Sequence, residues 1–205
     1  MYVMKHLWKQ FVQPHVDYCS HLWMPTNGSK LEALESLQRN FTVRIPSVRH
    51  LDYWSRLSEL QLLSQQRRLE RYRIIYLWKI IEGIMPNCGV EARNNERLGR
   101  MCVIPELKTR AAASVKTLRE NSFQIHGPKL FNCLPIHIRN MKNCGVDEFK
   151  SELDKILEII PDQPNVPGMY TPTACDLYSG KPSNSLIDQI RITEVPSKPK
   201  RRIGV

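Results

Sequence analysis

The sequence predicts a mostly α-helical protein: a small helical bundle with short irregular or β pieces and a disordered C-terminal tail. Two observations predict the bundle. Apolar residues recur every three or four positions along several segments, and capping residues or prolines stand at the ends of those segments. A third observation predicts the tail, because seven of the fourteen prolines lie at or beyond Pro161, where apolar periodicity is lost. With 41% hydrophobic residues among 205, the chain can bury a core.

The first predicted helix covers residues 1–12. Val3, Leu7 and Phe11 recur at intervals of four and therefore share one face of it. Pro14 is expected to end this helix, because proline lacks the backbone N–H that continuation requires. Since the apolar spacing is in place from the first residues, we expect the chain to be a piece of a longer protein.

A second helix is predicted from about Ser29 to Ile45, and Pro46 ends it. Ser29 followed three residues later by Glu32 is the pattern of a capping box, in which each side chain binds a free backbone N–H of the first turn. One apolar stripe at helical spacing is expected to form its core face. That stripe consists of Leu34, Leu37, Phe41 and Ile45.

A short helix is predicted over residues 53–60, ahead of the longest helix of the chain. Ser64 is the expected N-cap of that long helix, which runs to about Ile84 and closes at Gly83 and Pro86. Its first half is basic and amphipathic, and its second half is apolar on nearly all sides, which is typical of a central helix. Its apolar residues are Leu69, Tyr72, Ile74, Ile75, Tyr76, Leu77, Trp78, Ile80 and Ile81.

Residues 87–120 are less periodic and rich in arginine and asparagine. They are predicted to form a loop, with a short strand near residues 101–104. Residues 122–125 and 129–134 are predicted to be short packed pieces, because Gly127 and the proline after it interrupt a helix between them.

The last predicted helix begins near Asp147, a good N-cap, and extends to Ile159. The chain is thus expected to divide into a helical region over 1–86, a C-terminal extension over 87–160 and a largely disordered tail over 161–205. Such a tail cannot bury enough apolar surface to offset the entropy of ordering it. The predicted buried stripe of the last helix is Phe149, Leu153, Ile156 and Ile160.

The net charge of +10 is concentrated in one stretch. Residues 61–120 hold 12 lysines and arginines against 6 acidic residues. A concentration of this kind is typical of a protein with a polyanionic partner. The alternative is that these side chains only solvate a helical surface, and charge alone does not separate the two readings.

No targeting or membrane segment is predicted. No apolar run with a cleavage site follows the N-terminus, and the most apolar stretch, residues 74–84, is too short for a membrane span and carries Lys79 and Glu82. Cysteines without paired spacing favour free thiols in a reducing, intracellular compartment, nuclear or cytoplasmic. A basic cluster over residues 198–202 is typical of a nuclear import signal. The six cysteines are Cys19, Cys88, Cys102, Cys133, Cys144 and Cys175.

Motifs for metal or cofactor binding are missing from the sequence. Cys133, His137 and Cys144 are the nearest approach to a zinc site, but zinc needs four ligands with compact paired spacing. Two small buried thiols and one surface imidazole are the expected alternative. No glycine-rich phosphate loop is present. We therefore expect no metal, no cofactor and no small-molecule substrate.

Four fragments at characteristic spacing resemble the segment that follows the polymerase core in non-LTR (LINE-type) retrotransposon reverse transcriptases. The similarity is closest to the Jockey-like and chicken-repeat-like elements of animals. The fragments are His15-Val16-Asp17-Tyr18-Cys19-Ser20 running into Trp23, then Leu34-Glu35-Ser36-Leu37-Gln38-Arg39, then Tyr53 and Arg56-Leu57 ahead of Leu60-Gln61-Leu62, then Arg67-Arg68 before Arg71-Tyr72.

A later part of the chain also resembles this family, in which a Trp-Asn-x-Leu-Pro run precedes a final helix. Here Phe131 stands in place of the tryptophan and begins the run that ends at Pro135; Phe149-Lys150 and Leu153-Asp154 follow. The resemblance therefore covers about residues 1–160.

The resemblance implies a thumb-like helical module without catalysis of its own. The family's polymerase needs two adjacent aspartates to hold catalytic metal ions. No two aspartates of this chain are adjacent, and Asp17, which Tyr18 follows, lies in the segment that resembles the post-catalytic helix. We expect Asp17 to make a structural hydrogen bond. The aromatic and aliphatic residues expected in the thumb core are Trp23, Leu34, Leu37, Phe41, Tyr53, Leu57, Leu60, Tyr72, Tyr76 and Trp78.

The resemblance also implies contact with the backbone of RNA or DNA, as an RNA–DNA hybrid, because a thumb lies against the primer–template. Exposed arginines are the expected contacts, and phosphate contacts give affinity and register rather than sequence choice. The alternative for arginines is ion pairing between helices. A helical protein-interaction module and a non-functional product of a decayed element are the alternative functions. The candidate arginines are Arg39, Arg44, Arg67, Arg68, Arg71 and Arg73.

Overall fold

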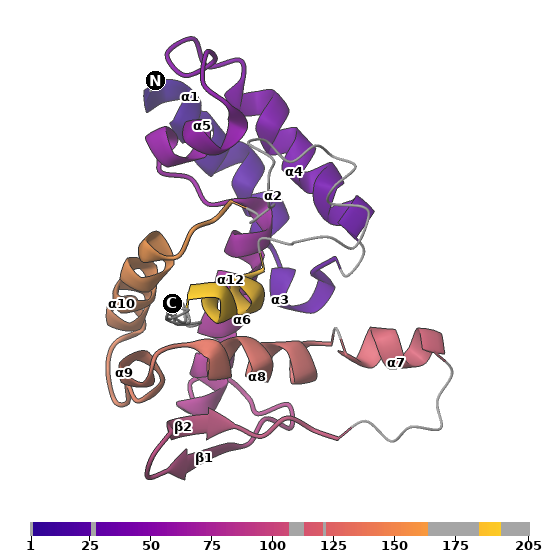
Figure 1. Cartoon of the computed structure of the whole chain (residues 1–205), viewed down its shortest axis with the longest axis vertical. Helices are drawn as coiled ribbons and strands as arrows, with labels where there is room; N and C mark the ends of the chain where they lie inside the picture. Colours follow the sequence, from indigo (N-terminus) through magenta and orange to yellow (C-terminus); the bar gives the residue numbers. More distant parts are fainter. Residues whose placement is uncertain (1, 26–27, 107–112, 121, 164–184, 194–205) are drawn as a thin grey trace, which may run out of the picture.

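The computed structural model describes residues 2–25, 28–106, 113–120, 122–163 and 185–193. It is mostly helical with one two-stranded antiparallel hairpin, which confirms the predicted fold class (Figure 1). No described helix is long and apolar enough to cross a membrane. In chain order the elements are α1 (Tyr2–Leu7), the π-helical turn η1 (Trp8–Val12), α2 (Gln13–Asp17), α3 (Ser20–Trp23), α4 (Gly28–Thr42), α5 (Tyr53–Leu60), α6 (Gln65–Ile81), β1 (Ala92–Asn95), β2 (Gly99–Cys102), α7 (Ala113–Glu120), α8 (Phe123–Cys133), α9 (Ile136–Arg139), α10 (Val146–Ile159) and α12 (Leu186–Thr193).

Helix α6 is the axis of the molecule. In Figure 1 it runs between the N-terminal helices α1, α4 and α5 above and the β1–β2 hairpin below. Ser64 caps it as predicted, because its Oγ accepts the Arg67 N–H at 3.1 Å. The helix ends at Ile81, and Gly83 then adopts a φ of +73° that lets the Ile84 N–H bond the Lys79 carbonyl at 2.9 Å.

The larger apolar core surrounds the second half of α6. Trp78 is fully buried at its centre, as predicted; its ring stacks on Phe149 at 4.4 Å and its Nε1–H donates to the Met141 carbonyl at 3.1 Å. Helices α8, α10 and α12 close the core around it. Its buried members are Ile74, Ile75, Leu77, Trp78, Ile80, Val90, Cys102, Leu130, Phe131, Leu134, Ile138, Phe149, Leu153, Leu157, Ile160, Leu186 and Ile190.

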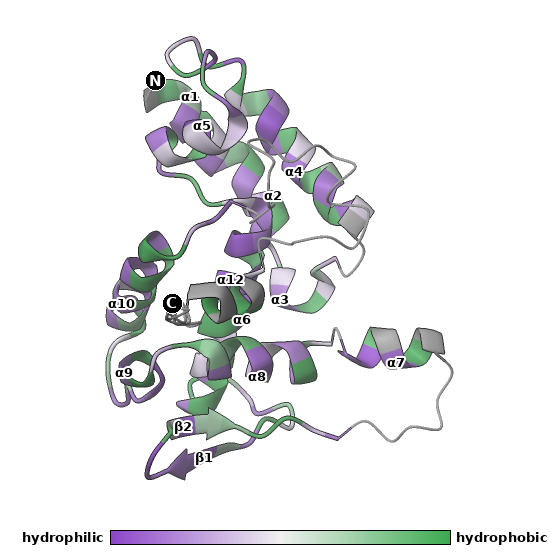
Figure 2. Ribbon diagram, in the orientation of Figure 1, coloured by the Kyte–Doolittle hydropathy of each residue, from purple (hydrophilic) through white to green (hydrophobic). Residues whose placement is uncertain are grey.

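A second, smaller core joins the N-terminal helices. It includes four of the residues expected in the thumb core, Phe41, Tyr53, Leu57 and Leu60. The predicted face of α4 is wrong in part, because Leu37 is 54% exposed. The helix turns a polar face inward instead, and Figure 2 shows the mixed hydropathy along α4. That inward face consists of Glu32, Glu35, Gln38 and Thr42.

The N-terminal helix differs from its prediction in two ways. Pro14 does not end it, because a proline in the first turn of α2 loses only an N–H that has no helical partner. The stripe of Val3 and Phe11 faces solvent, at 72% and 65% exposure. The buried position is Trp8, 3% exposed, which donates from Nε1 to Gln13 Oε1 at 2.6 Å. Trp23, expected in the core, is also exposed.

Residues 87–120, predicted as a loop with one strand, contain a hairpin and a helix. Strand β1 pairs with β2 in antiparallel register, with Ala92 opposite Cys102. The Asn132 side chain docks β2 onto α8 by bonding both the N–H and the carbonyl of Cys102, at 2.8 and 2.9 Å. Helix α7 projects away from the body (Figure 1). Paired backbone bonds supplied by a distant asparagine stabilise a strand that lacks an apolar pattern of its own.

The two pieces predicted around Gly127 are one helix, α8. Pro128 lies inside it and removes one backbone hydrogen bond without breaking the helix. Burial of Leu130 and Phe131 in the larger core offsets that loss. Packing in the larger core therefore outweighs the helix-breaking tendency of Gly127 and Pro128.

The last two described helices confirm one prediction and correct another. Helix α10 begins one residue before Asp147, with Gly145 as its N-cap, and buries Phe149 and Leu153 as expected. The chain beyond residue 161 was predicted to lack structure, yet α12 returns to the larger core and buries Leu186. The buried apolar residues of α12 are Leu186 and Ile190, one helical turn apart. A single turn is too short to give a recognisable apolar pattern in the sequence. The remainder of the predicted tail, residues 164–184 and 194–205, lies outside the described residues.

Candidate nucleic-acid interface

The arginines of α6 were expected to be exposed, and the structure shows that they are engaged inside the protein. Arg67 is 0% exposed; it donates to the carbonyls of Ile160 and Pro161, at 3.2 and 2.8 Å. Asp162 lies 3.7 Å away and also accepts from the backbone N–H of Ser64. The side chain of Arg67 therefore holds the chain after α10 against the start of α6.

Arg68 binds Asp17 through two parallel hydrogen bonds of 2.9 and 2.6 Å. The Tyr72 hydroxyl donates to the same carboxylate at 3.1 Å. Burial opposes the charge on Arg68, but the hydrogen bonds and charge of Asp17 outweigh it and raise the pKa of the guanidinium. This contact confirms the structural role predicted for Asp17.

Arg71 and Arg73 also have partners in other helices. Arg71 donates to Asp154 of α10 at 2.7 Å. Arg73 is buried and lies 3.0 Å from Nδ1 of His126 in α8. Burial lowers the pKa of Arg73 to about 10, against the opposing effect of Glu70. Burial, together with the charges of Arg73 and Lys129, lowers the pKa of His126 to about 4, so that imidazole is neutral at pH 7.

The two candidate arginines outside α6 differ from each other. Arg39 pairs with Glu32 at 2.7 Å and lies over the ring of Tyr53, 4.9 Å from its centroid. The Arg44 side chain is exposed and has no hydrogen-bond or ion-pair partner among the described residues. Of the six predicted arginines, Arg44 alone within the described chain meets the expectation of an exposed, unpaired cation.

Arg49 lies on the same exposed loop as Arg44. Residues 43–51 connect α4 to α5, and Ile45 and Val48, each 1% exposed, anchor this loop in the smaller core. Backbone bonds from Val48 and Arg49 to the Ile45 carbonyl, at 3.2 and 3.0 Å, fold it into tight turns. Arg49, like Arg44, is exposed. The only signal in the sequence was an apolar residue next to each arginine, Ile45 and Val48, and two apolar positions are too few to identify an anchored loop.

Buried polar contacts fix this loop and α5 to α4 and α6. The Glu35 carboxylate accepts from the Tyr53 hydroxyl and, at 2.8 Å, from the N–H of Gln65 in the first turn of α6. Gln38 donates to the Leu63 carbonyl at 3.0 Å. Arg56 donates to the Leu51 carbonyl at 2.7 Å. These contacts give the interface a rigid base.

Burial raises the pKa of Glu35 to about 7, and the charge of Asp162 adds to this effect. The hydrogen bonds from Tyr53 and Gln65 act in the opposite direction, as does the charge of Arg39. Burial and the neighbouring Glu35 also raise the pKa of Tyr53. In this pair the Tyr53 hydroxyl keeps its proton and donates a hydrogen bond, and the Glu35 carboxyl group, whose pKa is about 7, accepts it.

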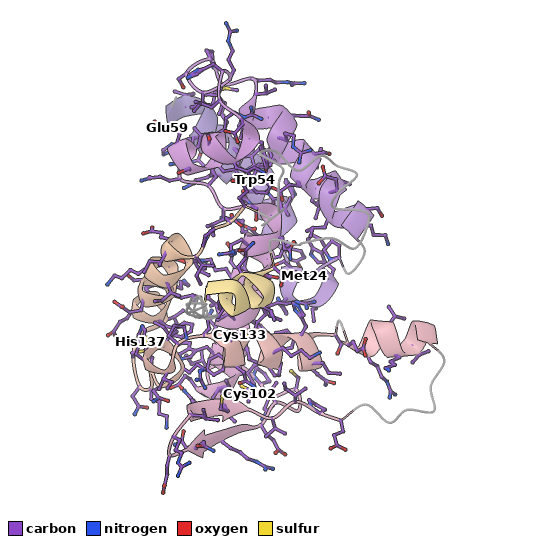
Figure 3. The ribbon with its side chains drawn as sticks, in the orientation of Figure 1. Met24, Trp54, Glu59, Cys102, Cys133 and His137 are labelled. Atoms are coloured by element: carbon purple, nitrogen blue, oxygen red, sulfur yellow. The ribbon has the colours of Figure 1, made fainter. Side chains whose placement is uncertain are left out.

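The residues that resembled a zinc site do not converge on one. Cys133 and Cys144 are half-buried against the larger core, whereas His137 is exposed, and Figure 3 shows His137 on α9 and Cys133 on α8. Within the described ranges no three His, Cys, Asp or Glu side chains are grouped to hold a metal ion. Cys175 lies outside those ranges.

The function of the chain has to be inferred from its residues and their geometry, because comparisons with known proteins give no match. No family model, curated protein or solved structure matches the chain.

Proposed function

We propose that the chain is the thumb-like C-terminal module of a non-LTR retrotransposon reverse transcriptase and contacts a nucleic-acid backbone without catalysing a reaction. The observation that carries the proposal is that all four fragments of the sequence resemblance meet in one unit. Asp17 binds Arg68 and Tyr72, and Glu35 binds Tyr53. These contacts give a structural reason for the four fragments to occur together at this spacing.

Four aspartates within the described residues support a non-catalytic role. Asp17 and Asp154 each hold an arginine of α6 in a two-bond ion pair. Asp52 caps α5 through the N–H of Trp54 at 3.0 Å, and Asp162 accepts from Ser64 at the start of α6. Carboxylates with these partners are not available as a pair for two metal ions.

The proposed backbone contact is the loop of residues 43–51. The arginines of α6 have partners inside the protein, so they add little to attraction at the surface. Arg44 and Arg49 are exposed on a loop that buried neighbours hold in place. Because the backbone of the loop is anchored, binding does not have to order it, and the planar guanidinium groups fit phosphate oxygens. Such contacts give affinity and register for an RNA–DNA hybrid, without sequence preference.

Salt dependence of hybrid binding tests the proposal. Each phosphate contact contributes about 0.9 to the slope of log affinity against log salt for a duplex. We expect the Arg44→Gln/Arg49→Gln double variant to flatten that slope by up to about two units. The matched control is Arg93→Gln/Arg97→Gln, which removes two exposed arginines from the β1–β2 hairpin at the opposite end of the molecule. Equal slopes for the wild type and the first variant would contradict the proposal.

A second function, protein interaction, is favoured by the exposed apolar residues of the N-terminal helices. The largest are Val3, Leu7, Phe11, Tyr18, Leu22 and Trp23. Self-association or partner binding that is insensitive to salt and is lost in Phe11→Gln would favour this function over backbone contact.

Access to chromatin is part of the proposed role, because a retroelement enzyme acts there. The cluster over residues 198–202 is the proposed import signal, and it lies outside the described residues. A fluorescent fusion too large for passive diffusion is expected to enter the nucleus with the cluster and to stay in the cytoplasm without it. Cytoplasmic retention in both cases would contradict nuclear import by this signal.

A further inference from the structure

Arg56 of α5 is buried, and its side chain reaches both ends of the loop of residues 43–51. Its Nε–H donates at 3.3 Å to the hydroxyl of Thr42, the last residue of α4 before the loop begins. Its Nη1–H donates at 2.7 Å to the carbonyl of Leu51, where the loop ends. One guanidinium therefore ties the two ends of the loop together.

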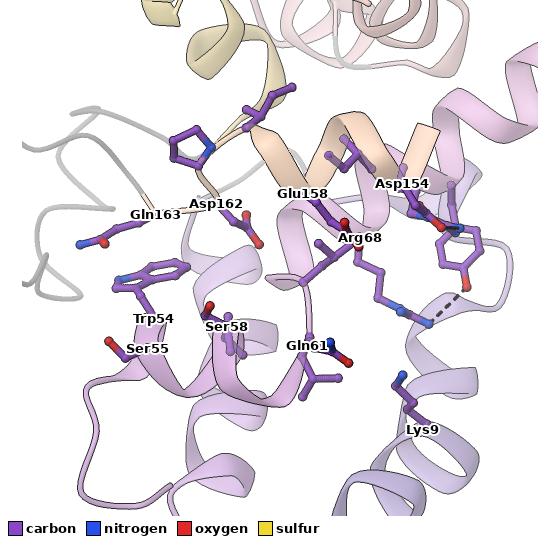
Figure 4. A pocket seen from close by; sticks show the side chains of 18 residues that line it. Lys9, Trp54, Ser55, Ser58, Gln61, Arg68, Asp154, Glu158, Asp162 and Gln163 are labelled. Atoms are coloured by element: carbon purple, nitrogen blue, oxygen red, sulfur yellow. Dashed lines mark hydrogen bonds and ion pairs between the residues drawn. The ribbon is translucent and has the colours of Figure 1, made fainter. Parts of the chain in front are cut away.

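The two sides of α5 differ in what they contact. One side lines a groove of about 910 Å³ between α5 and the end of α10, and Figure 4 shows Trp54, Ser55 and Ser58 there. Arg56 does not line this groove. Only 7% of it is exposed, and it forms no ion pair within the part of the chain that the structure describes. Its hydrogen bonds therefore serve the loop and not a surface ligand or a carboxylate.

The chemistry of arginine suits this position. A guanidinium is planar and donates in several directions at once. Burial of a cation without a carboxylate partner is costly, and hydrogen bonds have to offset that cost. The Thr42 hydroxyl is itself fixed, because it donates to the Arg39 carbonyl at 3.1 Å while it accepts from Arg56. A glutamine in place of Arg56 has one amide group and does not meet both acceptors.

The loop ends that Arg56 holds lie next to the exposed arginines of the proposed backbone contact. Arg44 is two residues after Thr42. Arg49 is two residues before Leu51. A loop with fixed ends and an anchored middle loses less conformational freedom when its side chains bind a ligand. The closure by Arg56 therefore bears on both phosphate contacts at once.

We propose that Arg56 is a positioning residue for the nucleic-acid contact and acts through the loop without touching the ligand. It holds both ends of residues 43–51, so that Arg44 and Arg49 meet the phosphates of an RNA–DNA hybrid from a backbone that is already ordered. Because Arg56 acts through these two arginines, its role rests on the proposed function. Its loss should weaken binding although its own side chain has no access to a phosphate.

Arg56→Gln and a matched control, Arg139→Gln, separate positioning from general stability. Arg139 is also buried and donates to two backbone carbonyls, those of Leu134 and Arg100 at 2.7 and 2.8 Å, in the region of the larger core. We expect Arg56→Gln to bind an RNA–DNA hybrid about tenfold more weakly, because the loop must then be ordered on binding. Its salt slope should equal that of the wild type, because both phosphate contacts still form in the complex. Arg139→Gln should change neither affinity nor slope.

Thr42→Val is the milder variant, and it tests the same contact if Arg56→Gln does not fold. It keeps the shape of the side chain and removes the hydroxyl that accepts from Arg56. We expect hybrid binding to weaken about threefold, because one end of the loop is released. Thr42→Ser keeps the hydroxyl and should restore the wild-type affinity. Equal affinities of Thr42→Val and the wild type would contradict the positioning role.

Hybrid binding by folded Arg56→Gln gives further outcomes that overturn the proposal. An affinity equal to that of the wild type would do so, as would equal losses in Arg56→Gln and Arg139→Gln. A salt slope flatter by about 0.9 would also overturn it, because Arg56 would then contact a phosphate directly.

The Arg44→Gln/Arg49→Gln double variant separates this role from the proposed function. If the double variant binds the hybrid like the wild type, the backbone contact fails and the role of Arg56 fails with it. If the double variant binds weakly and Arg56→Gln binds like the wild type, only the role of Arg56 fails. We expect Arg56→Gln to cause no further loss of affinity when it is added to the double variant. An additive loss would contradict action through the loop.

Discussion

The N-terminal region, residues 2–60, buries a small apolar core beside the polar face of α4, and the region around the second half of α6 buries a larger apolar core. The smaller core of the N-terminal region lies beside buried Glu35 and Gln38, while Val3 and Phe11 of the same region face solvent. The larger core around Trp78 is apolar throughout. The N-terminal region therefore combines apolar packing with the directional hydrogen bonds of Glu35 and Gln38, whereas the centre of the larger core around Trp78 is held by packing.

This difference determines how each region responds to substitution. Apolar packing tolerates changes of similar volume and loses stability when a cavity forms. A buried carboxylate instead depends on its donors, because an unpaired buried charge is costly. Truncation of an apolar residue in the larger core should lower stability at all pH values, whereas substitution of Glu35 should change how stability depends on pH.

The largest expected effect is that of Trp78→Ala in the larger core. The truncation removes the stack on Phe149 and leaves a cavity at the centre of α6. We expect a loss of about 3–5 kcal/mol in the free energy of unfolding, which is enough to unfold a marginal domain. Chemical denaturation measures it, with Trp23→Ala as the exposed control. Equal stability of Trp78→Ala and the wild type would contradict the central position of α6.

Leu186→Ala tests whether α12 belongs to the larger core. Leu186 is 0% exposed, and its backbone N–H donates to Glu70 of α6 at 2.8 Å. A buried leucine reduced to alanine typically costs about 2–5 kcal/mol. Leu22→Ala, at a leucine that is 70% exposed, is the control and should keep the wild-type stability. If Leu186→Ala melts at the wild-type temperature, α12 does not contribute to the core.

The N-terminal region should lose stability as pH rises, through Glu35. Its folded pKa is raised from 4.5 to about 7, so the folded state holds the proton more tightly and stability falls as pH rises between those two values. His126 acts in the opposite sense, because burial lowers its pKa from 6.5 to about 4. The folded state therefore loses stability as pH falls from about 6.5 to about 4. Glu70, raised to about 7 by burial, adds to the effect of Glu35.

Glu35→Gln isolates this contribution. The variant keeps a side-chain acceptor for Tyr53 and removes the titrating charge. We expect its unfolding free energy to fall less than that of the wild type between about pH 4.5 and 7, by up to about 3 kcal/mol, since each pKa unit corresponds to about 1.4 kcal/mol. Glu59→Gln, exposed on α5, is the matched control. Identical pH profiles for Glu35→Gln and the wild type would show that Glu35 is not buried as a shared acceptor.

The smallest expected effect is that of Phe11→Gln. Phe11 faces solvent, so its replacement should change the unfolding free energy by no more than about 0.5 kcal/mol. Trp8→Ala, three residues earlier, should cost about 3–5 kcal/mol because Trp8 is buried. A large loss in Phe11→Gln would mean that the N-terminal helix is turned the other way.

The sequence predicted the larger core better than the smaller one, and the reason is physical. Helix α6 and its Ser64 cap followed from apolar spacing and a local side-chain bond. The inward face of α4 did not, because Glu35 is buried only by virtue of Tyr53 and Gln65, which are distant in sequence. Periodicity assigns apolar residues to the interior and cannot anticipate a polar face with remote partners.

The candidate interface shows the same limit. The sequence identifies Arg68 as a cation, but its partner Asp17 is 51 residues away, so pairing was visible only in three dimensions. Arg44 was among the predicted contacts and stays exposed. Arg49 was overlooked because no regular periodicity marks its loop. Charge density along the chain predicted a basic segment, but not which arginines remain free.

The central claim is that Arg68 holds the fold whereas Arg44 contacts nucleic acid. The most direct test measures the unfolding free energy and the RNA–DNA hybrid affinity of Arg68→Gln and Arg44→Gln side by side. We expect Arg68→Gln to lower stability, because Asp17 loses both of its hydrogen bonds from Arg68. We expect Arg44→Gln to fold like the wild type and to bind the hybrid more weakly, with a salt slope flatter by about 0.9. Weaker binding of folded Arg68→Gln together with unchanged binding of Arg44→Gln would contradict the claim.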